Sequence, residues 1–184
     1  MKKKVILTIV FVILFILLVA GVTYAIYTWS VNNINVNGTL ECFRVNYVKG
    51  QDIGSENEYK VFMPSDDYTG GLYASVIVNM DKECINNGVG TLYLNTDEST
   101  SDILLTSGVL KYQVIINSLT LGGTGTITST GVLTIGENLN IVDSAQYTVV
   151  VWIDGNMINS GNLNEILSSS YIGSISMKVE SGDL

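Results

Sequence analysis

The stretch Leu72–Met80 (LYASVIVNM) decides the fold class, because its side chains alternate with a period of two. One face carries Leu72, Ala74, Val76, Val78 and Met80, and the other carries Tyr73, Ser75, Ile77 and Asn79. Successive side chains of a β-strand point to opposite faces, so this pattern predicts a strand with a continuous apolar inner face. The preceding Gly70 and Gly71 supply turn chemistry.

Runs of the same kind continue along the chain in both directions. They are rich in β-branched and aromatic residues, and clusters of Gly, Asn, Asp and Ser separate them at intervals of about ten to twenty residues. These runs are 36–48, 59–63, 90–95, 110–119, 122–130, 132–135, 146–153 and 171–179. About eight strands with this spacing predict an all-β fold, a two-sheet antiparallel sandwich, with jelly-roll topology or, as the alternative, an Ig-like one.

Three segments carry more specific expectations. The run 146–153 (QYTVVVWI) is nearly all apolar, which predicts a central strand covered on both faces and places Trp152 in the core. The run Tyr59–Met63 is expected to stop at Pro64, the only proline of the chain. Ser160–Leu167 (SGNLNEIL) is the only helix expected after the N-terminal segment.

The N-terminus has the layout of a secretory signal. Residues 2–4 (KKK) precede an apolar run over 5–22, so the charged end is expected to stay in the cytoplasm while the rest of the chain is exported. Residues Val22–Ala25 (VTYA) fit a signal-peptidase site, which predicts cleavage between Ala25 and Ile26.

An uncleaved membrane anchor is the alternative. The apolar run is close to the ~20 residues that span a bilayer, and Tyr24, Tyr27 and Trp29 would then lie at the membrane interface. In that case residues 5–27 hold the protein in the membrane. Both interpretations place residues 30–184 outside the cell or on its surface, with membrane contact only through the N-terminal segment.

The chain is therefore expected to have three parts. Residues 1–25 form a signal peptide or membrane anchor, residues 26–36 form an N-terminal strand or linker, and residues 37–184 form a single β-sandwich domain. The exported length is that of one domain with a hydrophobic core of ordinary size.

Composition restricts the function. The exported part has 17 acidic and six basic residues, which argues against a nucleic-acid partner because phosphate binding needs a basic face. The chain has no histidine, which removes Ser-His-Asp and Cys-His catalysis and imidazole metal sites. No catalytic residue, metal ion or cofactor is expected. The carboxylate pairs Asp66–Asp67 and Asp97–Glu98 are interpreted as solvated turns.

Two cysteines, Cys42 and Cys84, remain to be explained. In an oxidising compartment an even pair is most simply a disulfide. Closing a loop of about forty residues would stabilise the fold by about 3–4 kcal/mol. Two reduced core thiols or a metal-binding pair are the alternatives.

The residues after the expected cleavage point form a second alternating pattern. In Ile26–Val31 (IYTWSV), the side chains of Tyr27, Trp29 and Val31 face one way. A free strand of this kind can pair with an exposed sheet edge of another subunit, and head-to-tail addition gives filaments. The alternative is that Tyr27 and Trp29 lie at the membrane interface or cap the core of their own domain.

The N-terminal region also resembles a known family. The stretch 21–30 (GVTYAIYTWS), followed by Gly38–Leu40 (GTL), looks like the TasA/camelysin-like secreted Firmicute proteins that a dedicated signal peptidase processes. With the later 152–155 (WIDG), it is also similar to a group of secreted proteins of gut Firmicutes. The resemblance is most specific over residues 1–40. It implies a jelly-roll subunit of an extracellular biofilm-matrix fibre, assembled by N-terminal strand donation.

Three functions are compared on this basis. The leading hypothesis is an exported, non-enzymatic structural protein of the cell surface or biofilm matrix, with itself or other surface proteins and a signal peptidase as partners. The alternative is a membrane-tethered adhesin or ligand-binding module, in which exposed aromatic residues such as Tyr68, Tyr73 or Trp152 stack on a ligand. The third is an enzyme that uses carboxylates alone, with Asp154 and Glu165 as the pair; a turn Asp and a surface-helix Glu are the commoner explanation.

Overall fold

The computed structural model describes residues 42–57, 61–84 and 87–181. Several sequence-based predictions fall on other parts of the chain: the signal peptide or anchor (1–25 or 5–27), the bond between Ala25 and Ile26, and the strand with Tyr27, Trp29 and Val31. Within the described ranges, no helix is long and apolar enough to cross a membrane.

The described residues form nine strands and four short helices. The strands are β1 (Phe43–Tyr47), β2 (Pro64–Ser65), β3 (Leu72–Met80), β4 (Gly88–Thr96), β5 (Leu110–Ile116), β6 (Thr120–Thr126), β7 (Gly131–Ile141), β8 (Ser144–Asp154) and β9 (Gly173–Ser181). The helices are the 3₁₀ turns η1 (Tyr68–Gly70) and η2 (Gly155–Met157) and the one-turn helices α2 (Asp102–Thr106) and α3 (Leu163–Leu167). The all-β prediction is confirmed.

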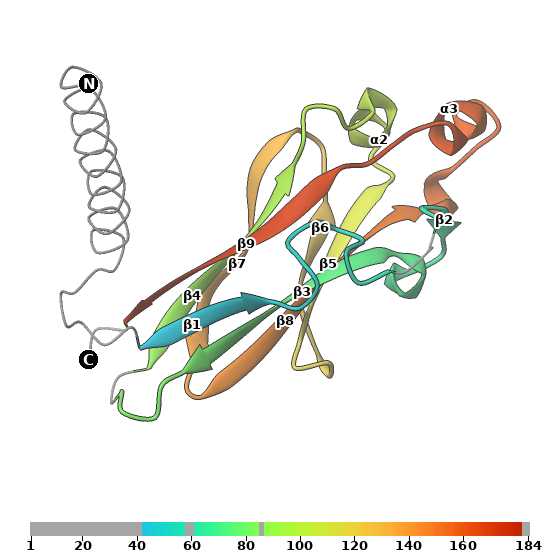
Figure 1. Ribbon diagram of the computed structural model, residues 1–184. Coiled ribbons are helices and arrows are strands. Elements are labelled where there is room, and N and C mark those ends of the chain that lie inside the picture. Colours follow the sequence, from blue (N-terminus) through green and yellow to red (C-terminus); the bar gives the residue numbers. More distant parts are fainter. Residues whose placement is uncertain (1–41, 58–60, 85–86, 182–184) are drawn as a thin grey trace, which may run out of the picture. The chain divides into compact units, whose positions relative to one another are not determined.

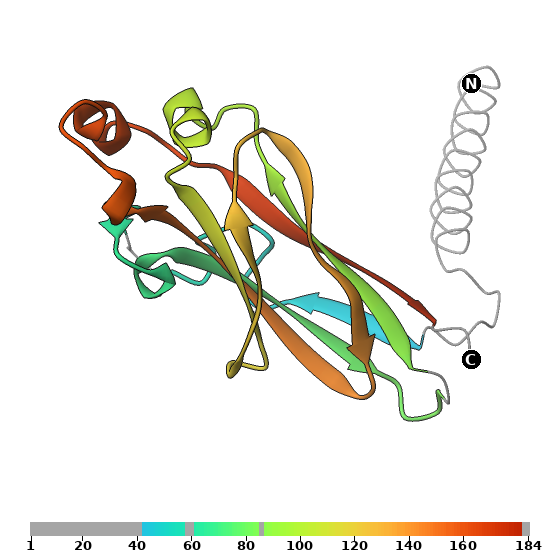
Figure 2. The same ribbon diagram turned by 180° about the vertical axis from the view of Figure 1, so that it is seen from behind.

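The strands belong to two sheets that pack face to face (Figure 1 and Figure 2). The larger sheet has the order β1-β3-β8-β5-β6, and the two-residue β2 runs parallel to the end of β8. The smaller sheet has the order β7-β4-β9. Neighbours along both orders are antiparallel. The predicted two-sheet antiparallel sandwich is therefore confirmed.

The strand pairs are nested, as in a jelly roll. β5 pairs with β6, β4 with β7, and β3 with β8, so each pair encloses the previous one in sequence. The next pair outward would join β1 to β9, but β1 pairs with β3 instead. The chain reaches β9 just after β1, where Ile53 N donates to Gly173 O and Ile175 N donates to Gln51 O, both at 2.8 Å. The predicted jelly-roll topology is present, with its first strand divided between the sheets.

The core lies between the two sheets and consists of apolar residues at alternate strand positions. On β3 and β8 these are the positions that a period of two predicts. The most buried residues include Ala74, Val76 and Val78 on β3, Tyr147, Val149, Val151 and Ile153 on β8, Leu92 and Leu94 on β4, and Ile175 on β9. Full burial of a side chain such as Val or Ile stabilises by about 1.5–3 kcal/mol.

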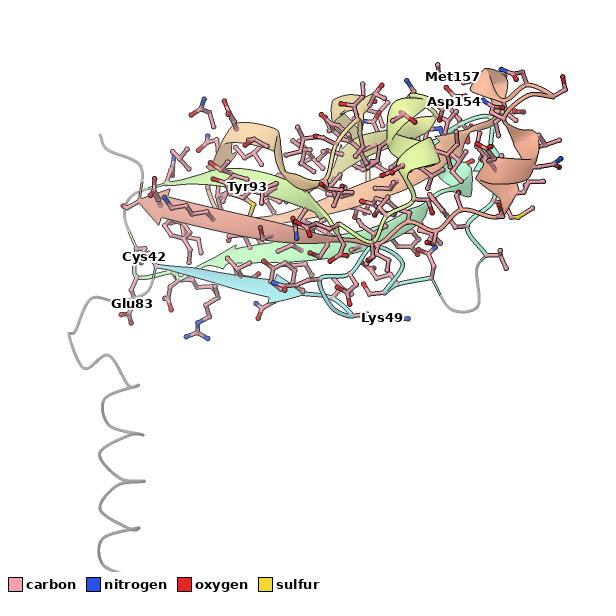
Figure 3. All side chains as sticks on the ribbon, turned by 90° about the horizontal axis from the view of Figure 1, so that it is seen from above. Cys42, Lys49, Glu83, Tyr93, Asp154 and Met157 are labelled. Carbon is pink, nitrogen blue, oxygen red and sulfur yellow. A yellow bond between two sulfur atoms is a disulfide. The ribbon has the colours of Figure 1, made fainter. Side chains whose placement is uncertain are left out.

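Cys42 and Cys84 form a disulfide, as the sequence predicts, and their Cα atoms are 5.6 Å apart. The bond ties the start of β1 to the loop after β3. Figure 3 shows Cys42 and Glu83 at one end of the sandwich and Asp154 and Met157 at the other. A disulfide is compatible with an extracellular protein.

Several expected strand boundaries are wrong: residues 61–63 do not form a strand, and β6 ends at Thr126 instead of reaching residue 130. Pro64 begins β2 instead of stopping a strand, since the first residue of a strand can lack an N–H. β5 stops at Ile116 and does not reach the expected Leu119. The reason is that Asn117 and Ser118 adopt left-handed backbone angles, with φ of 50° and 60°.

The prediction of a single helix after the N-terminal segment is also wrong. α3 lies inside the expected range 160–167, but α2 was not expected. Its start and stop signals are present in the sequence: Ser101 precedes the apolar residues 103–105, and Gly108 follows with a φ of 72°. Because α2 has only one turn, its apolar residues do not show a helical period.

Candidate ligand-binding site

The candidate site lies on the outer face of the six-stranded sheet, opposite the core. Because β8 turns Val149 and Val151 inward, the alternate residues Thr148, Val150 and Trp152 face outward. Strand pairing aligns them with outward residues of β3 and β5 in rows that cross the sheet. One row is Ser75–Thr148–Ile115, and the next is Tyr73–Val150–Gln113.

The 3₁₀ turn η1 covers part of this face, and Asp67 holds the turn in place. Asp67 Oδ1 accepts hydrogen bonds from Thr69 Oγ1 at 2.5 Å and from Thr69 N at 2.9 Å. The hydroxyl and then the backbone N–H of Thr69 lower the pKa of Asp67. The carboxylate is therefore ionised at neutral pH, and the interpretation of this residue as part of a solvated turn agrees with its place.

Gly71 lets the chain lie directly on β8 after η1. A Cβ atom at this position would be 2.5 Å from Val150 Cγ1 and 2.6 Å from Val151 O. Both distances are shorter than van der Waals contact, so any other residue would lift the chain from the sheet. The position of η1 over β8 therefore depends on this glycine.

A hollow of about 220 Å³ lies between η1 and β3 on the outer face. Its lining residues are Tyr68, Thr69, Gly71, Tyr73, Ile115, Thr148 and Val150. Two tyrosines thus flank a floor that β8 and β5 supply, and none of the seven described lining residues carries a charge. The volume is below the ~300–1,000 Å³ of drug-sized pockets, which suits one ring-sized group.

Hydroxyl groups supply polar contacts at the floor of the hollow. Thr148 Oγ1 and Ser75 Oγ share a hydrogen bond of 2.8 Å. In such a pair one hydroxyl donates and the other accepts, so the accepting hydroxyl keeps its own hydrogen. When Ser75 donates, the O–H of Thr148 remains able to donate to a group in the hollow. A mainly apolar lining with a few placed polar groups is typical of small-molecule sites.

Trp152 lies outside the core, which corrects the sequence-based prediction. It faces outward on β8 and is half-buried. Its ring centroid is 6.4 Å from that of Tyr68, and the ring planes meet at 68°, an edge-to-face contact. The prediction was wrong because the run 146–153 is apolar on both faces, so the pattern alone does not say which face meets the second sheet. Trp152 supports Tyr68 and is not one of the lining residues.

The sequence identified the aromatic residues of this region but not their partners. Tyr68 and Tyr73 line one hollow, and Trp152 packs against Tyr68. Thr148 and Ile115 were not singled out. The alternation in β8 groups Thr148 with Val150, but bringing them beside η1 requires the strand register, for which the sequence has no local signal.

The carboxylates considered for catalysis take other roles. Asp154 Oδ1 accepts from Asn156 N at 3.1 Å and caps η2, and Glu165 is exposed on α3. Asp97 Oδ1 accepts hydrogen bonds from the hydroxyl and the backbone N–H of Ser99, which lower the pKa of Asp97. Asp67 and Asp97 are thus matched turn residues, one beside the hollow and one in the turn before α2.

Comparison with known proteins gives distant structural likenesses only. No family model matches the chain, and no curated protein matches it. A family two carbohydrate esterase from Cellvibrio japonicus is 7% identical over 77% of this chain and 34% of its own, with a TM-score of 0.30. An acetyl xylan esterase from the rumen bacterium Butyrivibrio proteoclasticus is 9% identical over 77% of this chain and 31% of its own, with a TM-score of 0.33.

A third similar structure is TmCBM61 in complex with β-1,4-galactotriose. It is 8% identical over 77% of this chain and 90% of its own, with a TM-score of 0.31. The chain spans about one third of the length of the two esterases. Likenesses this weak carry no argument about activity or ligand, and the description of the fold rests on the strand pairing of the chain itself.

Proposed function

We propose that the protein is an exported, non-enzymatic binding module of the cell surface whose ligand places one uncharged ring in the hollow between Tyr68 and Tyr73. The observation that carries this proposal is the pairing of two aromatic walls with an uncharged floor in one hollow. A tyrosine side chain combines a large apolar ring with a polar hydroxyl group, which suits a ligand with one apolar face and one hydrated face.

The rest of the chain agrees with this function. The N-terminal segment predicts export, with residues 5–27 as a membrane tether or residues 1–25 as a cleaved signal, and the disulfide suits an oxidising exterior. The floor of the site consists of paired strands whose other face forms the core. A preformed site on regular strands binds without the cost of ordering a loop.

The test uses the purified full-length protein with phenol and methyl glucoside as neutral ring probes, detected by saturation-transfer NMR. We expect at least one probe to bind, and Tyr73→Ala to abolish its signal because one aromatic wall is lost. Tyr93→Ala is the matched control, since Tyr93 is a half-buried tyrosine on β4 of the other sheet (Figure 3). No binding of either probe, or equal loss in both variants, would overturn the proposal.

Self-assembly is a second proposed function, as in the TasA/camelysin-like proteins that residues 1–40 resemble. The observation that favours it is the edge of β9 that β1 leaves open. There, Met177 N donates to the Tyr47 hydroxyl at 3.2 Å. Among the described residues, Lys178–Ser181 pair with β4 alone. An added strand such as 26–36 would satisfy this edge.

Mass analysis of the N-terminus tests this second function. A mature start at Ile26 together with fibres in negative-stain microscopy would support it, and an intact Met1 in the membrane fraction would contradict it. Replacing Tyr27 and Trp29 by Asp is expected to abolish fibres and leave the melting temperature unchanged. Loss of the fold itself would show that these residues serve their own core.

A further inference from the structure

The ligand class follows from what surrounds the hollow, on the assumption that the proposed binding function is correct. On one side η1 closes the outer face, because the Tyr68 ring packs against Trp152 in the row beyond Tyr73 and Val150. A ligand seated in the hollow cannot continue in that direction. In the opposite direction along β8, the described residues of this face are half-buried or exposed: Ile77 and Gln146 are half-buried and Asn46 is exposed.

This opposite side carries a row of uncharged residues. Strand pairing places Asn46, Ile77 and Gln146 in one row, next to the row Ser75–Thr148–Ile115 that forms part of the floor. We call Asn46, Ile77 and Gln146 the amide row. Two residues along a strand advance about 7 Å, so the amide row is one ring-sized step from the hollow.

The chemistry of the amide row differs from that of the hollow. A carboxamide offers two N–H donors and one acceptor oxygen with no charge. Hydroxyl groups also donate and accept hydrogen bonds without a charge. The carboxamides of Asn46 and Gln146 on either side of the aliphatic Ile77 therefore fit a chain of hydroxyl-bearing rings. A purely apolar ligand would leave the amides of Asn46 and Gln146 and the Thr148 hydroxyl without new partners, and such losses weaken binding.

Charge argues for a neutral ligand. The ionised group bonded into the wall of the hollow is the carboxylate of Asp67, and the exported part of the chain has 17 acidic and six basic residues. An anionic group in the hollow would meet like charge at the wall, and the exposed cation on this side of the outer face, Arg44, lies one row beyond the amide row. The lining residues offer no opposite charge in return.

We infer that the site takes the end of a neutral glycan chain, with its terminal ring in the hollow between Tyr68 and Tyr73 and the following unit over the amide row. The closed side at η1 makes the recognised unit terminal, and the opposite side at Gln146 lets the chain continue. The floor hydroxyl of Thr148 and the carboxamide of Gln146 contact successive units.

Calorimetric titration of the full-length protein tests the inference. The probes are the neutral monosaccharides and linear trisaccharides of glucose, galactose, mannose and xylose, a trigalacturonate, and phenol. We expect one neutral trisaccharide to bind about tenfold more tightly than its monosaccharide, through added hydrogen bonds at the amide row. Trigalacturonate is expected to bind more weakly than that trisaccharide.

Variants separate the two parts of the site. Gln146→Ala is expected to lower trisaccharide affinity about three- to tenfold, the effect of one or two hydrogen bonds, and to leave monosaccharide affinity unchanged. Asn95→Ala, which removes an exposed amide on β4 of the other sheet, is the matched control and should change neither. Tyr73→Ala should weaken both saccharides.

The outcomes distinguish this inference from the proposed function. Tyr73-dependent binding of phenol without binding of any neutral saccharide would overturn the glycan assignment and leave the binding function standing. Equal affinity for mono- and trisaccharides, a null effect of Gln146→Ala, or preference for trigalacturonate would also overturn it. Absence of binding by every probe would contradict both.

Discussion

The two faces of β8 carry side chains of similar size but are covered very differently. Inward, Tyr147, Val149 and Val151 lie under the whole three-stranded sheet and are almost completely buried. Outward, Val150 is buried while Thr148 and Trp152 are half-buried, and the described residues that pack on this face include Tyr68 of η1 and Gly71. A face that is covered completely has no room for a ligand. A face that is covered in part keeps a hollow whose floor consists of the paired strands β3, β8 and β5.

The two sheets also differ at their edges, because β1 pairs with β3 of the larger sheet instead of with β9 of the smaller one. β1 adds to the larger sheet, so the sheet that carries the hollow gains an edge strand. Among the described residues, the end of β9 then pairs with β4 alone. The two proposed functions use these two consequences. Ligand binding uses the widened outer face of the larger sheet, and self-assembly uses this end of β9 in the smaller one.

The largest expected effect is on the free energy of unfolding, when isoleucines on opposite faces of the larger sheet are replaced by alanine. Ile153→Ala on the inner face of β8 is expected to lower the free energy of unfolding by about 2–5 kcal/mol, because it removes buried atoms and leaves a cavity. Ile115→Ala, the same substitution in the half-buried floor of the hollow, should cost less and should weaken phenol binding. Urea denaturation and phenol titration measure both. Equal costs in the two variants would contradict the difference between the faces.

The disulfide is expected to stabilise the whole fold without affecting phenol binding. Reduction or Cys84→Ser removes a cross-link between residues 42 apart in sequence and should lower the free energy of unfolding by about 3–4 kcal/mol. Urea denaturation with and without dithiothreitol measures this loss. Phenol binding should be unchanged where the reduced protein is still folded. A large change in phenol affinity there would show that the site depends on the position of β1.

Gly71→Ala tests how the outer face acquires its partial cover. The new Cβ would meet Val150 Cγ1 at 2.5 Å and the Val151 carbonyl oxygen at 2.6 Å, so the chain after η1 must move. We expect a loss of about 1–3 kcal/mol in unfolding free energy and a loss of phenol binding. Gly155→Ala is the matched control, because the nearest atoms to its Cβ lie at 3.5 Å. A variant at Gly71 that binds phenol normally would refute the role of close approach.

The smallest expected effect is the pH dependence of η1. The pKa of Asp67 lies below its ordinary 3.8 because the ionised form accepts hydrogen bonds from Thr69. A depressed pKa in the folded state means that the stabilisation is present above pH 3.8 and disappears as the pH falls through the folded-state pKa. Phenol affinity should therefore decline below pH 3.8 toward the value of Asp67→Ala.

Asp97→Ala is the matched control for this pH dependence. Asp97 makes the same two hydrogen bonds to Ser99 in the turn before α2, and its pKa is lowered for the same reason. Removing it should leave phenol affinity and its pH profile as in the unchanged protein. An identical profile for Asp67→Ala and the unchanged protein would show that the Asp67 carboxylate does not hold the wall.

The sequence predicts the fold better than it predicts the site, for physical reasons. A period of two at Leu72–Met80 reports directly that one face is buried, and the turn residues between such runs mark the strand ends. The nearly apolar run 146–153 lacks this contrast, which is why Trp152 was placed in the core. Trp152 faces outward because the alternate residues Val149, Val151 and Ile153 of β8 form the core, and Tyr68 of the η1 turn packs against it.

The disulfide and the aromatic residues could be predicted in part from the sequence. Cys42 and Cys84 could be paired from composition because only two cysteines exist. Tyr68 and Tyr73 could be named as exposed aromatic residues, but their juxtaposition with Thr148 and Ile115 arises from pairing across three strands. Residues of one row are distant in sequence, so no local pattern joins them.

Backbone amide chemical shifts of the full-length protein, recorded by NMR during a phenol titration, test the central claim most directly. If the partly covered outer face is the binding surface, the amides of Thr69, Tyr73 and Thr148 shift together, while those of Leu92 and Ile175 in the smaller sheet do not. Shifts confined to Lys178–Ser181, or spread evenly over both sheets, would contradict the account.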